Sequence, residues 1–176
     1  ILLDEVKDGL GDAGTTEASR PSKRVGFDIS AFYMPNNWLM LDLDYALSRA
    51  RFTDSDPAGD HIPGAISGVG KLAISVTNMG PFLGSMQLRY FGERSLTEDN
   101  SARSDHTVTL NGQIGYKIDK NVRVLMQGFN LLNTKAHAID YFYPSRLPGE
   151  SPSGVADLHF HPIESRSLRA SLIVNY

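Results

Sequence analysis

The feature that most constrains the fold is a two-residue alternation of apolar and polar side chains that returns along most of the chain. Successive side chains of a strand point to opposite faces, so such an alternation predicts a sheet with one apolar and one polar face. Residues 165–176 show it well, with polar side chains at most of the intervening positions. Their apolar set is Leu168, Ala170, Leu172, Val174 and Tyr176.

The same alternation predicts six further strands and a partial one at residues 1–7. The six segments are 24–34, 38–52, 68–79, 82–92, 105–118 and 122–132. Segment 38–52 is the clearest, because five apolar residues from Leu39 to Leu47 lie on one face and Asp42, Asp44, Ala46 and Ser48 lie on the other. At about 3.3 Å per residue this strand would be roughly 45–50 Å long, well above the usual length.

The predicted connections alternate between long and short. The short ones are 35–37, 80–81 and 119–121, and the long ones are 9–23, 53–67, 93–104 and 133–164. In an up-and-down meander successive connections lie at opposite ends of the sheet. The sequence therefore predicts an all-β, antiparallel up-and-down meander with its long loops at one end and its tight turns at the other.

Composition narrows the function classes. The formal net charge of −3 gives no reason to expect a polyanion partner, so no nucleic-acid binding is predicted. Cysteine is absent, which excludes a disulfide framework and thiolate chemistry. No apolar run approaches the ~20 residues of a membrane helix. The chain begins in the middle of a pattern and without a methionine, so we expect a fragment of a longer protein.

Long strands that are polar on one face and apolar on the other, with turns and loops segregated, are typical of a transmembrane β-barrel. Two groups of aromatic residues agree with the interfacial belts of such a barrel. The group toward the tight turns is Tyr33, Trp38, Phe82, Tyr116 and Tyr176, and the group toward the loops is Phe52, Tyr90 and Phe91. A soluble sandwich with long strands is the alternative, because alternation alone does not say which face meets lipid.

Four short segments carry a resemblance to a known family. They are residues 50–52 (ARF) followed by 62–65 (IPGA), residues 88–92 (LRYFG), residues 129–133 (FNLLN), and a final strand that ends in an aromatic residue. In their order and spacing they cover nearly the whole chain. Together they resemble the C-terminal part of the β-barrel of TonB-dependent outer-membrane receptors.

This resemblance implies a barrel of about 22 strands with a plugged lumen. Residues 1–176 would form one partial β-barrel domain of about eight C-terminal strands, with the plug and the N-terminal strands absent. The function implied is a receptor in the outer membrane of a Gram-negative bacterium that imports a scarce ligand, such as an iron-siderophore complex. The implied partners are outer-membrane lipid, the TonB system through the missing N-terminal region, and a small-molecule ligand such as a metal chelate. No cofactor is expected.

Two other function classes stay open beside the receptor. The chain could form the wall of a passive porin-type channel, which lacks a plug and a TonB-binding segment. It could also be a soluble β-rich binding module, if the apolar faces pack against each other in water.

Segment 136–164 is the candidate ligand-binding region. Tyr141, Tyr143, Arg146 and Glu150 are the predicted contacts, because aromatic and charged loop residues suit an anionic or aromatic ligand. The alternative is that these side chains fold the loop on itself. A second hypothesis is a divalent metal held by Asp157, His159 and His161, which alternate on one face of an extended segment. Its alternative is that both histidines pack within the folded loop.

No catalytic motif is present, and the chain is predicted not to be an enzyme. Residues 149–154 (GESPSG) miss the spacing of a nucleophile elbow by one residue. The glycines of residues 9–14 (GLGDAG) match a dinucleotide fingerprint, but no helical pattern follows them. Asp42 and Asp44 alternate on the polar face of a long strand, where carboxylates that line a barrel wall are common.

Overall fold

The computed structural model describes residues 3–6, 15–18 and 20–176, and the side chains from residue 20 onward. The glycine motif at residues 9–14 lies outside the described residues. Residues 15–18, which were predicted to belong to the first loop, form a strand. The strands are β1 (Leu3–Val6), β2 (Thr15–Ala18), β3 (Ser22–Tyr33), β4 (Leu39–Phe52), β5 (Gly68–Met79), β6 (Phe82–Phe91), β7 (Thr107–Lys117), β8 (Val122–Phe129), β9 (His137–Ser145), β10 (Val155–Pro162) and β11 (Ser167–Val174).

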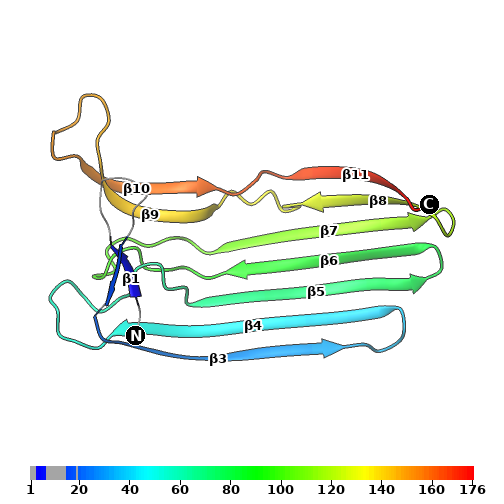
Figure 1. Ribbon diagram of the computed structural model, residues 1–176, viewed down its shortest axis with the longest axis horizontal. Coiled ribbons are helices and arrows are strands. Elements are labelled where there is room, and N and C mark those ends of the chain that lie inside the picture. Colours follow the sequence, from blue (N-terminus) through cyan, green and yellow to red (C-terminus); the bar gives the residue numbers. More distant parts are fainter. Residues whose placement is uncertain (1–2, 7–14, 19) are drawn as a thin grey trace.

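Seven strands form one antiparallel sheet in the order β11-β8-β7-β6-β5-β4-β3. They coincide with the seven complete strands predicted from the alternation, so the all-β meander is confirmed. Figure 1 shows the three tight turns at one end of this sheet and the long connections at the other. Two separate hairpins, β1–β2 and β9–β10, lie at the loop end. The described residues contain no helix long and apolar enough to cross a membrane.

The strand register aligns side chains of like character in rows across the sheet. One row runs from β3 to β7 through Ala31, Leu43, Leu72, Leu88 and Leu110, each opposite the next. Because neighbouring residues of a strand point to opposite faces, the adjacent row lies on the other side of the sheet. That row is polar throughout and consists of Ser30, Asp44, Lys71, Arg89 and Thr109.

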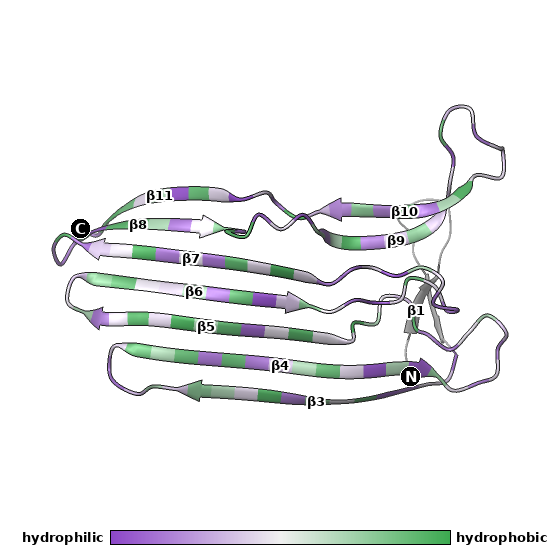
Figure 2. Ribbon diagram, turned by 180° about the vertical axis from the view of Figure 1, so that it is seen from behind, coloured by the Kyte–Doolittle hydropathy of each residue, from purple (hydrophilic) through white to green (hydrophobic). Residues whose placement is uncertain are grey.

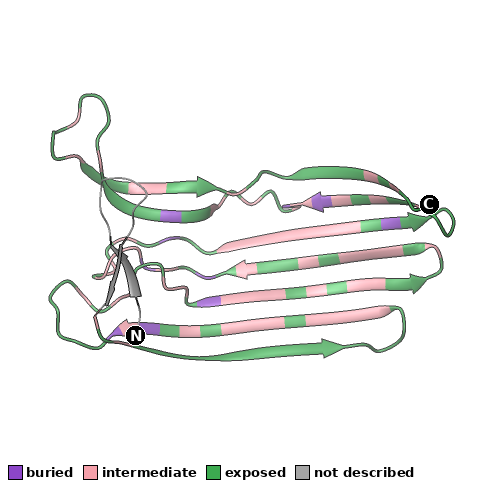
Figure 3. Cartoon of the chain, in the orientation of Figure 1, coloured by how far each residue is buried: buried purple, intermediate pink, exposed green. Residues whose placement is uncertain are grey.

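The apolar face is not covered by any other described part of the chain. Phe27, Ile114 and Leu172 are 54%, 67% and 65% exposed. The green bands of Figure 2 mark such apolar residues along the strands, and Figure 3 shows that most strand residues are exposed or intermediate. Among the described apolar side chains only Ala50 and Phe52 are buried, at 5% and 6% exposure. A large apolar face without a protein partner marks a surface made for another apolar medium or partner.

Two further details differ from expectation. Segment 133–164 is not a plain loop, because it contains the hairpin β9–β10. Consecutive aromatic residues and Pro144 interrupt the two-residue alternation there, so the pattern gave no strand signal. Phe52 and Phe91 alternate with Tyr45 and Tyr90, which places both phenylalanines on the polar face and outside an aromatic belt on the apolar face.

Candidate functional site

The hairpin β9–β10 brings most of the predicted site residues onto one surface. Its register places Tyr141 opposite His159 and Tyr143 opposite Asp157. His161 lies two residues further along β10, so it shares this face. In Figure 1 the hairpin stands at the loop end, beyond the ends of β8 and β11.

Aromatic stacking orders this surface. The rings of Tyr143 and His159 lie nearly parallel, with centroids 3.9 Å apart at 14°. The Nε2 atom of His159 is buried and has no hydrogen-bond partner among the described residues. Tyr141 and Tyr143 are still about half exposed. The face therefore exposes flat aromatic surface to solvent, and stacking against His159 holds the Tyr143 ring in place.

The three residues of the metal hypothesis do not converge on a common point in the structure. Same-face residues of an extended strand are about 6.6 Å apart, so Asp157 and His161 are separated by about 13 Å along β10. Asp157 Oδ1 accepts a hydrogen bond from the backbone N–H of Leu158 at 2.7 Å. Within the described part of the chain, no group of three histidine, aspartate or glutamate side chains is gathered as a metal site. The set Asp157, His159 and His161 stays a prediction.

Arg146 and Glu150 shape the tip of the hairpin. Arg146 Nε donates a hydrogen bond to the carbonyl of Glu150 at 3.3 Å, and Glu150 Oε2 accepts one from the N–H of Leu147 at 2.7 Å. These contacts turn the chain between β9 and β10. Their role in ligand binding stays a prediction, and the two side chains lie on the tip while the tyrosines lie on the strand.

A buried ion pair anchors the other face of the hairpin. Asp140 is 7% exposed, and its carboxylate lies 2.9 Å from Arg94 in the β6–β7 connection and 2.5 Å from His137 Nδ1. The His137 ring stacks on Phe160 with centroids 3.7 Å apart. A buried carboxylate needs such partners because desolvation penalises its charge. Sequence reasoning missed this anchor, since no local pattern joins residues that are 46 positions apart.

The FNLLN segment forms the base of the hairpin. Asn130 and Asn133 have φ of 46° and 52°, a left-handed conformation that asparagine tolerates better than most residues. The amide of Asn130 donates to the carbonyls of Thr134 and Glu164, both at 3.0 Å, and accepts from the N–H of Thr134. Asn130 therefore bends the chain after β8 and clasps both ends of the segment that contains the hairpin.

A second cluster ties the remaining loops to one another. Arg20 hydrogen-bonds Asp54, Glu98 and the carbonyl of Gly59, and its guanidinium lies 4.2 Å from the centroid of the Phe52 ring. The hydrogen bond from Arg20 lowers the pKa of Asp54 and raises that of Arg20. Hydrogen bonds from Thr97 and Ser101 lower the pKa of Asp99 to about 2. The loop end is thus a connected polar rim.

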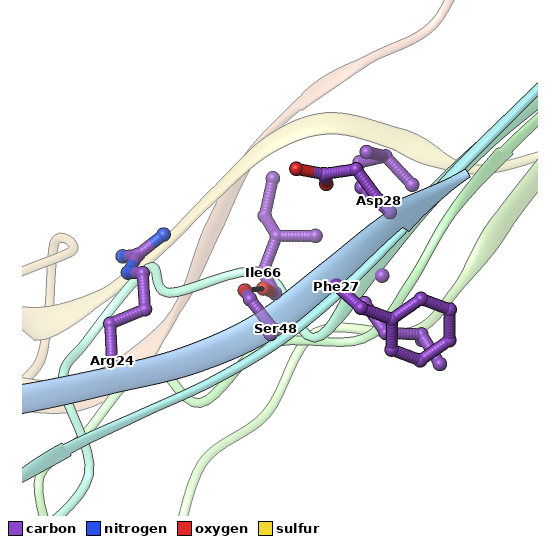
Figure 4. Close-up of a pocket in the computed structure, with 10 residues that line it drawn as sticks. Arg24, Phe27, Asp28, Ser48 and Ile66 are labelled. Atoms are coloured by element: carbon purple, nitrogen blue, oxygen red, sulfur yellow. Dashed lines mark hydrogen bonds between the residues drawn. The ribbon is translucent and has the colours of Figure 1, made fainter. Parts of the chain in front are cut away.

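The polar face of the sheet carries its own ion pairs. Lys71 Nζ lies 2.8 Å from Asp42 and 2.7 Å from Asp44, and Ser30 Oγ donates to Asp44 at 2.7 Å. These contacts agree with a barrel wall whose polar face carries acidic and basic side chains that neutralise each other's charge. Figure 4 shows the two faces at β3, where Arg24 and Asp28 point to one side of the ribbon and Phe27 to the other.

The fold with these features is that of a section of the β-barrel of TonB-dependent outer-membrane receptors. No protein-family model matches the sequence. No curated protein is similar enough in sequence to be matched. The likeness is therefore one of structure, and it shows the fold.

Three solved structures illustrate the likeness. The closed form of the ferric-catecholate import receptor Fiu from E. coli K12 superposes with a TM-score of 0.69 over 97% of this chain and 23% of that one, at 17% identity. The siderophore receptor PiuA from Acinetobacter baumannii gives 0.65 over 86% and 22%, at 13% identity. The ferric yersiniabactin uptake receptor FyuA from Yersinia pestis gives 0.65 over 88% and 24%, at 16% identity. The chain spans about a fifth to a quarter of the length of these receptors.

Proposed function

We propose that this chain forms part of the wall of an outer-membrane receptor of a Gram-negative bacterium, which binds and imports a scarce ligand such as an iron-siderophore complex. The observation that carries the proposal is the sheet with leucine rows on one face and a polar, ion-paired row on the other. Such a sheet fits between lipid and an aqueous or plugged lumen. The ligand class is supported by the structural likeness to Fiu, PiuA and FyuA, which are receptors for ferric catecholates, siderophores and ferric yersiniabactin.

Residues 1–176 act as one partial barrel domain in this proposal. The sheet ends at β3 and β11, whose outer edges carry unpaired backbone groups within the described chain. Lipid offers no hydrogen-bond partners, so a spanning sheet has to close on itself. Further strands of the same protein would close the barrel, and a plug and a TonB-binding segment would lie in that remainder.

The hairpin surface is the proposed place of ligand contact. Tyr141 and Tyr143 offer flat aromatic area, and Arg146 at the tip offers a cation, with Glu150 beside it. An anionic or aromatic chelate would match these groups, because a guanidinium pairs with carboxylate or phenolate oxygens and aromatic side chains stack on the rings of a ligand. The set Asp157, His159 and His161 is kept as a weaker proposal for direct contact with a metal.

A catalytic role is not proposed. Two neighbouring carboxylates such as Asp42 and Asp44 could serve acid–base chemistry, but Lys71 engages both of them in ion pairs. Charge balance along a wall accounts for all three side chains.

The first test is the location of the complete protein. Recovery in the outer-membrane fraction, with a gel mobility that shifts on boiling, is the expected result for a closed barrel. Recovery in the soluble fraction without a shift would reject the barrel and favour a soluble binding module.

The second test separates import from passive diffusion. Uptake of radiolabelled ferric chelates is measured in iron-limited cells, with and without a working TonB system. A receptor takes up its ligand only with TonB, whereas a porin-type wall passes solute equally in both strains. The double variant Tyr141→Ala/Tyr143→Ala should lower ligand affinity at the cell surface by about tenfold or more, because each lost aromatic contact weakens binding. Tyr116→Ala, at the tight-turn end, is the matched control and should leave affinity unchanged.

A further inference from the structure

One side of β4 changes its chemistry in steps toward the loop end. This side carries every second residue of the strand, and the β3–β4 pairing shows no bulge from Leu41 to Phe52. Its residues toward the loop end are Leu43, Tyr45, Leu47, Arg49 and Arg51. The order is therefore apolar, aromatic, apolar and then basic along a single line. In crossing from the core of a lipid layer to its headgroups, apolar side chains likewise give way to aromatic and then to polar or charged ones.

The two arginines border a cavity of about 270 Å³ at the rim. It lies where the end of β4 meets the β4–β5 and β6–β7 connections. Four arginines, one histidine and one glutamate are its charged or titratable lining residues. They are Arg49, Arg51, Arg94, Arg103, His61 and Glu93, and we call this cavity the Arg49 pocket.

Positive charge in the Arg49 pocket is only partly balanced. Arg103 lies 3.0 Å from Glu93, and Arg94 is committed to the buried Asp140. Arg51 lies 3.5 Å from Asp60, an exposed carboxylate outside the lining. Among the side chains of residues 20–176, no carboxylate lies within salt-bridge distance of Arg49. A single anion with several oxygens would complete this arrangement.

The opposite end of the sheet lacks this combination. The strand cations nearest the tight turns are Lys117 and Arg123, which face each other across β7 and β8. Both alternate with Tyr116 and Val124 and so lie on the polar face. The apolar face therefore reaches basic residues at its loop end, where β4 continues into Arg49 and Arg51.

We infer that the Arg49 pocket binds the phosphate headgroup of an anionic lipid whose acyl chains lie along the apolar rows. Guanidinium groups bind phosphate oxygens in pairs, which gives both charge and geometry. A lipid also gains from the leucine face beside the pocket, whereas a free phosphate ion has nothing to gain there. The inference rests on the membrane part of the proposed function and is independent of ligand import.

The test measures which lipids stay on the complete protein. The protein is transferred into nanodiscs of phosphatidylcholine with phosphatidic acid as a minor component, and the lipids retained after detergent release are counted by native mass spectrometry. Enrichment of phosphatidic acid over phosphatidylcholine is expected for the wild type. The variants Arg49→Gln and Arg51→Gln should each lower this enrichment about fivefold, from the usual worth of one basic residue near an anionic lipid surface.

The control variant is Arg123→Gln, which removes the same charge from the other face and the other end. It should retain phosphatidic acid like the wild type. The mobility shift on boiling checks that each variant forms its barrel, and the wild-type comparison of the two lipids does not depend on any variant.

Three outcomes would overturn the inference. One is equal retention of both lipids by the wild type, and a second is unchanged enrichment in both Arg49→Gln and Arg51→Gln. The third is displacement of the retained lipid by millimolar inorganic phosphate, which would assign the pocket to a soluble anion. If the protein is recovered in the outer membrane but shows one of these outcomes, only the lipid site is rejected and the proposed function stands. A soluble protein loses the proposed function as well.

Discussion

The seven-stranded sheet and the β9–β10 hairpin are both antiparallel, yet they are held in place by different means. Each inner strand of the sheet has two hydrogen-bonded neighbours, and its side chains repeat in apolar and polar rows. The hairpin has only its own two strands, and it is fixed by the buried pair Arg94–Asp140, by stacked rings and by the Asn130 clasp. A continuous ladder of backbone hydrogen bonds suits a uniform wall. A few specific side-chain contacts suit a hairpin whose surface differs from the repeating rows of the sheet.

The largest effect should come from the buried anchor of the hairpin. Asp140→Ala leaves Arg94 without its partner, and breaking a buried ion pair in this way costs about 3–5 kcal/mol. Hydrogen exchange should then lose protection in β9 and β10 while β5 and β6 keep theirs. Asp140→Asn keeps an acceptor for Arg94 and should show a smaller loss. Equal loss in the sheet would mean that the two regions are not separate units.

A charge on the apolar face should affect the sheet and spare the hairpin. Leu72→Arg places a cation in the middle of a leucine row, at a cost of about 2–4 kcal/mol if that face meets lipid. The next residue provides the control, because Ala73→Arg faces the polar side and should be tolerated. The yield of heat-shifted protein and its urea midpoint measure both. If Ala73→Arg proves the more harmful, the assignment of the two faces is reversed.

The junction between the two regions depends on one side chain. Asn130→Ala removes the donors to Thr134 and Glu164 and the residue type that tolerates a positive φ, at about 2–3 kcal/mol. Asn130→Asp keeps the acceptor and the tolerance of φ but lacks the amide donors, so an intermediate loss is expected. Limited proteolysis within residues 131–136 and 163–166 reports the opening. Unchanged cleavage in Asn130→Ala would show that the clasp is not needed.

The smallest effect concerns acidity at the rim. The pKa of Asp54 is lowered in the folded state by its hydrogen bond with Arg20, so ionised Asp54 stabilises the rim above the ordinary aspartate pKa of about 4. This contribution is lost as the pH falls below that value and through the lowered pKa. Proteolysis by an acid-active protease should therefore increase within residues 53–60 at low pH. Asp54→Asn should remove most of this pH dependence, and an identical pH profile in the variant would exclude Asp54 as its source.

The same contrast explains what the sequence could predict. All seven strands of the sheet follow from alternation, because one face had to be apolar along their full length, as the row through Leu43 and Leu72 shows. The hairpin did not, since Tyr141, Phe142 and Tyr143 are consecutive and give no two-residue signal. Residues Tyr141, Tyr143 and His159 were singled out by their chemistry, and their register on one face emerged only with the structure. Arg94 and Asp140 were missed because their pairing depends on the fold.

The Asn130 clasp has a consequence for how such a chain diversifies. Because Asn130 bonds the carbonyls of Thr134 and Glu164, the polypeptide leaves and re-enters the wall at nearly the same point. We therefore expect that the segment between these two carbonyls can change in length and sequence without shifting the pairing of β8 with β11. Grafting a foreign segment between residues 134 and 164 should leave the strands of the wall in register. The recognition surface could then change in evolution independently of the sheet.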